Sequence, residues 1–118
     1  MKASENKADQ VGDVVKRKWG TYEIIKKGEG FQVKHLVVAP HCELSLQKHF
    51  HRSENWVVAK GVAGVVLEGN EMTLDEQESV FIPKCAVHKL KNLGVIPLEV
   101  IEVQLGSYVG EDDIVRYD

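Results

Sequence analysis

Short runs of alternating apolar and polar residues, separated by frequent turn signals, restrict the fold of this chain more than any other feature. Runs with strand character occupy 31–39, 44–51, 56–59, 62–67, 72–74, 79–82, 87–90 and 98–105. Turn signals separate several of them at 26–30, 68–70 and 92–94. Only 111–116 has the composition of a helical turn. Strands at this density, with so little helical pattern, predict an all-β sandwich or barrel.

The length and composition fit one folded domain. The chain has 118 residues, and its 43% apolar content is enough for one hydrophobic core. We expect a flexible N-terminal tail over 1–13 and the folded domain over 14–118, because the first residues are polar and lack periodicity. The net charge of −3, with both signs interspersed, argues against nucleic acid as a partner, since a basic stripe would be expected there.

Neither a membrane span nor a secretion signal is expected. Apolar runs such as 36–40 fall far short of the roughly 20 residues of a spanning helix, and the first residues lack the apolar stretch of a signal peptide. Cys42 and Cys85 are the only cysteines. Without a secretion signal we interpret them as reduced thiols, with a disulfide as the minority alternative. These features predict a cytoplasmic protein.

The stretch 46–56 concentrates polar side chains that are expensive to bury. In an extended strand, Gln47, His49 and His51 share one face, while Lys48 and Phe50 share the other. Nitrogen- and oxygen-bearing side chains on one face of an otherwise apolar strand are costly in a dry core. A metal ion is the simplest partner that would hold them there.

Together with a second stretch, 83–92, this region resembles the two sequence motifs of the cupins. The first motif reads His-x-His, three or four residues, Glu, six residues, Gly. Glu54 is followed by six residues and then by Gly61, which makes it the motif glutamate. Counting back four residues gives His49 as the second motif histidine, with Gln47 in the place of the first. His51 is out of register and is expected to be an extra histidine.

The second cupin motif reads Pro-x-Gly, two residues, His, three residues, Asn. Pro83, His88 and Asn92 match it, whereas Cys85 stands where glycine is usual. His41 likewise replaces a usual glycine before Gln47. The resemblance therefore implies a small cupin barrel, a double-stranded β-helix or jelly roll, with departures at two turns.

The metal ligands implied by the resemblance are Gln47, His49, Glu54 and His88. Two imidazole nitrogens, one carboxylate oxygen and one amide oxygen suit one divalent ion, with zinc expected first and manganese, iron, cobalt or nickel as alternatives. Such a set leaves coordination positions for water or substrate.

Glutamine in the first position narrows the resemblance to phosphomannose isomerases. The chain is most similar to the cupin domain that ends type II mannose-6-phosphate isomerase/mannose-1-phosphate guanylyltransferase enzymes, here as a stand-alone domain. The segments that carry this similarity are 17–22, 44–49, 51–58 and 106–116, and Lys18 departs from the usual Arg-Pro-Trp-Gly. The implied activity is a metal-dependent aldose–ketose isomerase acting on the sugar phosphates mannose 6-phosphate and fructose 6-phosphate.

The resemblance also implies roles for residues around the ligands. Arg52 and Arg116 are expected to be catalytic, and His51 is expected to act as a base or substrate contact. Ser45, on the face of Gln47, and Glu111, in the closing segment, are expected to bind the substrate.

Two other functions stay open at this point. The first is a module that binds a sugar or sugar phosphate without turnover. The second is an iron-dependent cupin oxygenase, because two histidines and one carboxylate form an iron(II) dioxygen site when positions are open; Gln47 argues against it. A homodimer is also expected, with 98–105 as a strand that offers an edge for pairing.

Overall fold

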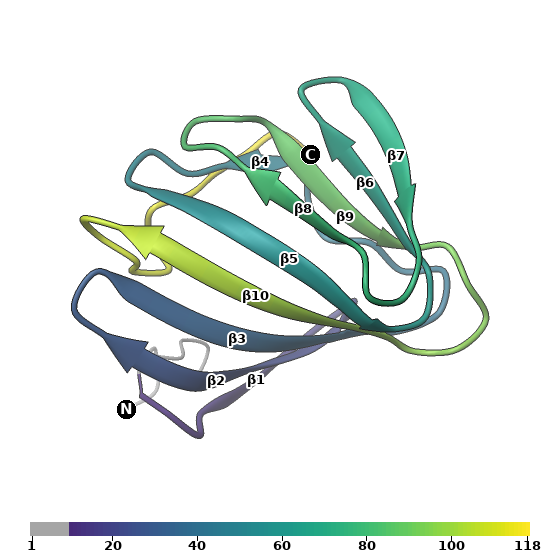
Figure 1. Ribbon diagram of the computed structural model, residues 1–118, viewed down its shortest axis with the longest axis horizontal. Helices are drawn as coiled ribbons and strands as arrows, with labels where there is room; N and C mark the ends of the chain where they lie inside the picture. Colours follow the sequence, from purple (N-terminus) through teal and green to yellow (C-terminus); the bar gives the residue numbers. More distant parts are fainter. Residues whose placement is uncertain (1–9) are drawn as a thin grey trace.

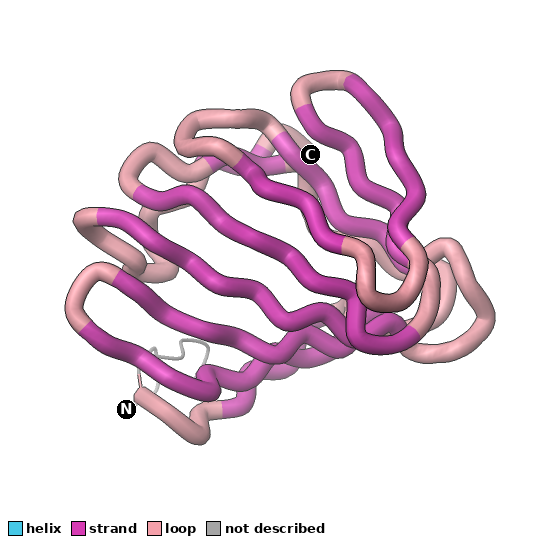
Figure 2. The backbone as a smooth tube through the Cα atoms, viewed as in Figure 1, coloured by secondary structure: helices cyan, strands magenta, loops and turns pink. Residues whose placement is uncertain are grey.

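The computed structural model describes residues 10–118, and within this range the chain forms eleven strands and no helix. The strands are β1 Val14–Arg17, β2 Gly20–Gly28, β3 Phe31–Val38, β4 Gln47–Lys48, β5 Arg52–Lys60, β6 Ala63–Leu67, β7 Asn70–Leu74, β8 Ser79–Ile82, β9 His88–Asn92, β10 Leu98–Gly106 and β11 Val115–Arg116. Figure 2 shows that only turns and loops connect them. Residues 1–9, most of the predicted tail, lie outside the described residues.

The strands form two sheets that face each other and enclose the interior (Figure 1). One sheet has the order β1-β2-β3-β10-β5-β8, and the other has the order β11-β4-β9-β6-β7. The pairing is antiparallel throughout these described strands. The all-β prediction is therefore confirmed. Nothing in residues 10–118 forms a helix able to cross a membrane.

The inner face of the larger sheet is apolar at one end and polar at the other. On β10 the inward side chains run from Leu98 and Val100, both fully buried, to the buried Glu102 and Gln104. β3 and β5 show the same change along their length, in register with β10. The apolar end closes the hydrophobic core, so the polar end is the part of the interior where a functional site can lie.

Three local predictions are wrong. Residues 44–51 form only the two-residue β4, because the chain bends at 50 and 51. Residues 111–116 form a turn followed by β11, which pairs with β4, rather than a helical turn. β10 does not offer an edge, because it is hydrogen-bonded to β3 on one side and β5 on the other. A dimer would need another surface.

The two replaced glycines keep a glycine-like backbone. His41 has φ 64° and Cys85 has φ 67°, both in the left-handed region. A side chain with a Cβ atom pays roughly 1–2 kcal/mol there. At Cys85 the strained backbone has a use, since its N–H donates to the carbonyl oxygen of His49 (2.8 Å). The departures from the motif therefore change the residue without changing the turn.

Cys85→Gly should raise the free energy of unfolding by up to about 1 kcal/mol. Glycine removes the left-handed strain, while part of the gain is lost to the larger entropy of the unfolded chain. Urea unfolding of the purified protein measures the effect. Cys85→Ala is the matched control, because it removes the thiol and keeps the Cβ atom. A glycine variant less stable than the alanine variant would contradict the strain argument.

Candidate metal centre

A cavity of about 280 Å³ lies between the two sheets at the polar end of the interior. Side chains from both sheets and from the closing segment line it. Four of them are the predicted metal ligands Gln47, His49, Glu54 and His88, and others are Ser45, Arg52, Glu111 and Arg116. Of the nine predicted catalytic, substrate-binding and metal residues, all except His51 thus line this cavity.

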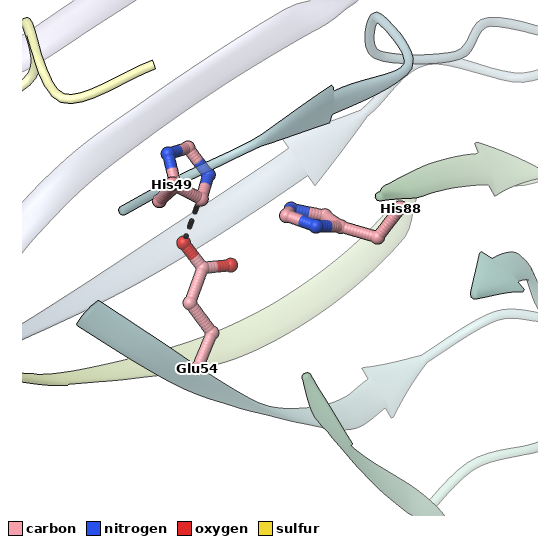
Figure 3. Close-up of side chains that lie close together, drawn as sticks. All are labelled: His49, Glu54 and His88. Atoms are coloured by element: carbon pink, nitrogen blue, oxygen red, sulfur yellow. Dashed lines mark ion pairs between the residues drawn. The ribbon is translucent and has the colours of Figure 1, made fainter. Parts of the chain in front are cut away.

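Three of the predicted ligands form a compact cluster (Figure 3). His49 directly follows β4, Glu54 lies in β5, and His88 begins β9. Their ligand atoms lie within 4.8 Å of one another, and all three residues are buried. His49 Nε2 and Glu54 Oε2 are 3.4 Å apart. The spacing inferred from the sequence thus brings together three donors of the types that divalent transition metals prefer.

Hydrogen bonds fix the tautomers of both histidines. His49 Nδ1 lies 2.7 Å from the carbonyl oxygen of Asp113, and His88 Nδ1 lies 2.9 Å from that of Ala86. A carbonyl oxygen can only accept, so each Nδ1 carries the proton and each Nε2 keeps a lone pair. Burial, aided by Arg52, lowers the pKa of His49 to about 4, and burial also lowers the pKa of His88. Two neutral imidazoles with oriented lone pairs fit a metal ion.

Arg52 binds and orients Glu54, the carboxylate of the cluster. Its Nε and Nη2 each lie 2.9 Å from Glu54 Oε2, and Nη2 also donates to His49 Nε2 at 3.3 Å. The other carboxylate oxygen, Oε1, accepts the indole N–H of Trp56 at 2.8 Å. Burial opposes the charge on Arg52, but Glu54, Glu102 and Glu111 outweigh it and raise its pKa. Arg52 is therefore a buried, charged group that orients two candidate ligands.

Gln47 lies beside this cluster and is oriented by Ser45. In the register of the smaller sheet, Gln47 is opposite His88. Its Nε2 donates to the Ser45 carbonyl oxygen (3.1 Å) and hydroxyl (3.3 Å). The amide nitrogen is thereby occupied, and the amide oxygen is the atom suited to a cation. Ser45 lies in the cavity, where it was expected, and serves as an acceptor for Gln47.

The closing segment 110–118 is tied to the ligand-bearing loop by Asp113. Its carboxylate accepts the backbone N–H groups of Phe50 (3.0 Å) and His51 (2.9 Å), while its carbonyl oxygen holds His49. Burial opposes ionisation of Asp113, but these two N–H donors and His51 lower its pKa. Arg116 of the same segment is exposed and lines the cavity at its mouth. The closing segment 110–118 is thus part of the site.

His51 does not lie where its strand position predicts. Its side chain is 57% exposed, it is not among the residues lining the cavity, and its Nδ1 lies 3.2 Å from Asp113 Oδ1. The prediction that it shares a face with Gln47 and His49 is wrong, because the chain leaves the strand before position 51. We therefore do not assign it the role of base.

Two charged residues inside the cavity were not predicted from the sequence. Lys34 of β3 and Glu102 of β10 are buried, line the cavity and are opposite each other in the sheet register. Burial and the neighbouring Glu54 raise the pKa of Glu102 to about 7. Burial alternates along β3 and β10 and turns both residues inward. The sequence of each strand has apolar residues on both faces, so the period of two alone does not reveal which face is buried.

Comparison with known proteins shows the family of the chain. A family profile described as "Mannose-6-phosphate isomerase C-terminal" matches residues 4–118. The alginate biosynthesis protein AlgA of Pseudomonas putida is 52% identical over 104 residues, which cover 88% of this chain and 21% of that protein. The mannose-1-phosphate guanylyltransferase of Escherichia coli is 46% identical over 117 residues, which cover 99% of this chain and 24% of that protein. The chain thus spans about a fifth to a quarter of these relatives.

Solved structures support the fold. An oxalate decarboxylase–formate complex from Lactobacillus farciminis has a TM-score of 0.77 and 18% identity, covering 88% of this chain and 33% of that chain. The cupin domain of Schizosaccharomyces pombe Cnp3 has a TM-score of 0.69 and 14% identity, covering 73% of this chain and 64% of that chain. The predicted double-stranded β-helix is confirmed. Fold, matched profile and relatives agree that this chain belongs to the family of mannose-6-phosphate isomerase C-terminal cupin domains.

Proposed function

We propose that this chain is a metal-dependent isomerase that interconverts mannose 6-phosphate and fructose 6-phosphate. The observation that carries the proposal is the cluster of His49, Glu54 and His88 inside a cavity that also holds buried charges of both signs. The family of the chain indicates the substrate. We further propose zinc as the ion, with Gln47 as a fourth ligand, a cytoplasmic location and a homodimeric state.

The proposed reaction moves a proton between two neighbouring carbon atoms of the sugar. The C2–H bond of the aldose breaks, its electron pair forms a C1=C2 double bond, and the carbonyl electron pair moves to O1. O1 then takes up a proton and becomes the C1 hydroxyl, a second proton enters at C1, the O2–H proton leaves, and the ketone forms at C2. A bound divalent ion would polarise the carbonyl and hydroxyl oxygens of the sugar.

Residues of the chain would orient the metal ligands and bind the phosphate of the substrate. Arg52 keeps Glu54 and His49 in position, and the closing segment covers the loop that carries His49. Cationic side chains at the cavity, namely Arg17, Lys18 and Arg116, suit the phosphate of the substrate. The cavity of about 280 Å³ is at the lower end of the size of small-molecule sites.

The proposal predicts isomerase activity in the purified protein loaded with zinc or manganese. Fructose 6-phosphate should form from mannose 6-phosphate, and His49→Ala should reduce the rate by more than about 100-fold, because loss of a residue that merely supports a metal ligand already costs about 10–100-fold. Elemental analysis of the purified protein should find one ion per chain. Absence of conversion in fully loaded protein would contradict the proposal, and oxygen uptake with iron but not zinc would favour the oxygenase instead.

A sugar-phosphate-binding module without turnover is the second candidate. The specific observation in its favour is that an Arg52 N–H already engages the His49 Nε2 lone pair and the Glu54 carboxylate, so that the cluster is satisfied within the chain. Stabilisation by mannose 6-phosphate without conversion would support this module. A ligand at one hundred times its dissociation constant adds about 2.7 kcal/mol.

A further inference from the structure

Lys34 is a buried cation of the cavity to which the proposed metal centre gives no role. It lies on the inward face of β3 and is only 4% exposed. Its ammonium group lies 4.2 Å from the centre of the Tyr22 ring. It forms an ion pair with Glu111 of the closing segment. A lysine buried to this degree is rare and needs compensation by a partner.

The two buried cations of the cavity differ in how they are held. Arg52 is bound by Glu54, which lies two positions away on the same strand and is 3% exposed in its side chain. Lys34 depends on Glu111, whose side chain is 26% exposed and which belongs to a turn at the cavity mouth. The partner of Lys34 can therefore be exchanged for another anion more easily than the partner of Arg52.

The position of Lys34 relative to the cluster suits a small sugar. Lys34 is opposite Glu102 of β10, and the next strand, β5, carries Glu54. Neighbouring strands are about 4.8 Å apart, so β3 and β5 are two strand spacings apart, and Glu54, which is opposite Gln104, is also offset from Lys34 by two residues along β10. Both side chains enter the same cavity. A substrate in this cavity would thus have both the cluster and the ammonium group on the walls of its site.

We propose that Lys34 is a further catalytic residue, whose ammonium group replaces its contact with Glu111 by a hydrogen bond to the substrate oxygen that becomes negative in the enediolate. This inference rests on the proposed isomerase function. When the C2–H electron pair forms the C1=C2 bond, the carbonyl pair moves to O1, and the Lys34 N–H donates to that oxygen. Lysine suits this role because its compact charge carries three rotatable donors.

The exposed cations at the cavity, and not Lys34, suit the phosphate of the substrate. Arg116 and Lys18 line the same cavity, and Arg116 is exposed, whereas Lys34 is buried beside Glu102. A phosphate dianion placed next to a buried carboxyl group would be disfavoured. The oxygen at the reacting end of the sugar carries charge only transiently, so a buried ammonium group is better matched to it.

Lys34→Met tests the inference in the full chain loaded with metal. Methionine keeps the apolar stem, and we expect kcat to fall by about 10²–10³-fold, as when one preorganised donor is removed, with KM changed less than threefold. Lys26→Met, an exposed position on β2, is the matched control and should match the wild type. The hydroxamate of a five-carbon aldonic acid 5-phosphate mimics the enediolate. Its dissociation constant should rise in Lys34→Met, while the dissociation constant of inorganic phosphate should stay unchanged.

The outcomes separate this inference from the proposed function. A wild type that converts mannose 6-phosphate, with a Lys34→Met variant within threefold of it in kcat, would overturn the role of Lys34 alone. A rise in KM and loss of phosphate binding, with kcat retained, would likewise overturn it in favour of a phosphate contact. An inactive wild type overturns both proposals. If Lys34→Met does not fold, Lys34→Ala with added propylammonium should recover activity, and failure of that rescue in a folded variant counts against the proposal.

Discussion

His88→Ala should remove metal binding and abolish isomerase activity. The substitution deletes one of two imidazoles whose Nε2 lone pairs are oriented into the cavity. Loss of residues that merely support metal ligands lowers metal affinity by about 10–100-fold, so the loss of a ligand itself should exceed that range. Elemental analysis after dialysis, and thermal unfolding with and without zinc, would measure the effect. The wild type should gain about 2.7 kcal/mol at one hundred times the dissociation constant, and the variant should gain nothing.

His35→Ala is the matched control for this experiment. His35 lies on the outward face of β3, where its Nε2 is 2.8 Å from Glu99 Oε1, and both side chains are 29% exposed. It should bind metal and turn over substrate as the wild type does. Equal metal content in the His88 variant and the control would show that the cluster is not the metal site.

Arg52→Ala should lower the free energy of unfolding by about 3–5 kcal/mol in the metal-free protein. The variant leaves the carboxylate of Glu54, which is 3% exposed, without the guanidinium that binds it. Removing one partner of a buried ion pair leaves an uncompensated charge, and effects of this size follow. Chemical denaturation measured by tryptophan fluorescence would show it, because Trp56 donates to the same carboxylate.

A double variant separates charge from packing in this prediction. Arg52→Met combined with Glu54→Gln removes both charges and keeps similar volume, so it should recover a large part of the lost stability. Lys89→Met is a useful comparison, because the partners of Lys89, Glu43 and Asp118, are 49% and 44% exposed. That variant should lose no more than about 1 kcal/mol. An equal loss at Lys89 and Arg52 would contradict the argument from burial.

The sequence predicted what depends on local pattern and failed where distant segments decide. Alternation gave the all-β class, and the strand at 79–82 has the same bounds as β8. Motif spacing brought His49, Glu54 and His88 together. His51 was misplaced because Asp113, 62 residues further along the chain, binds its backbone N–H and holds the bend. No pattern within 44–51 contains that information.

The same limit explains the error about β10 and the two missed charges. Whether a strand is central or at an edge depends on its partners, and β3 and β5 lie far from β10 in sequence. Lys34 and Glu102 are found at inward positions of alternating strands, where an apolar residue is usual. A charged residue in such a position conflicts with the pattern around it, and conflicts of this kind are typical of functional sites.

Residues 113–118 form several hydrogen bonds with the segment 46–49, which carries two of the candidate metal ligands. Asp118 accepts the N–H of Leu46 (2.7 Å), Tyr117 N–H donates to the carbonyl oxygen of Leu46 (2.8 Å), and the Asp113 carbonyl oxygen fixes the His49 ring. Any ion held through His49 is thereby coupled to docking of the C-terminus, and by thermodynamic linkage each must strengthen the other to the same extent. Detachment of the C-terminal residues and dissociation of the ion would then be coupled, so that each one promotes the other.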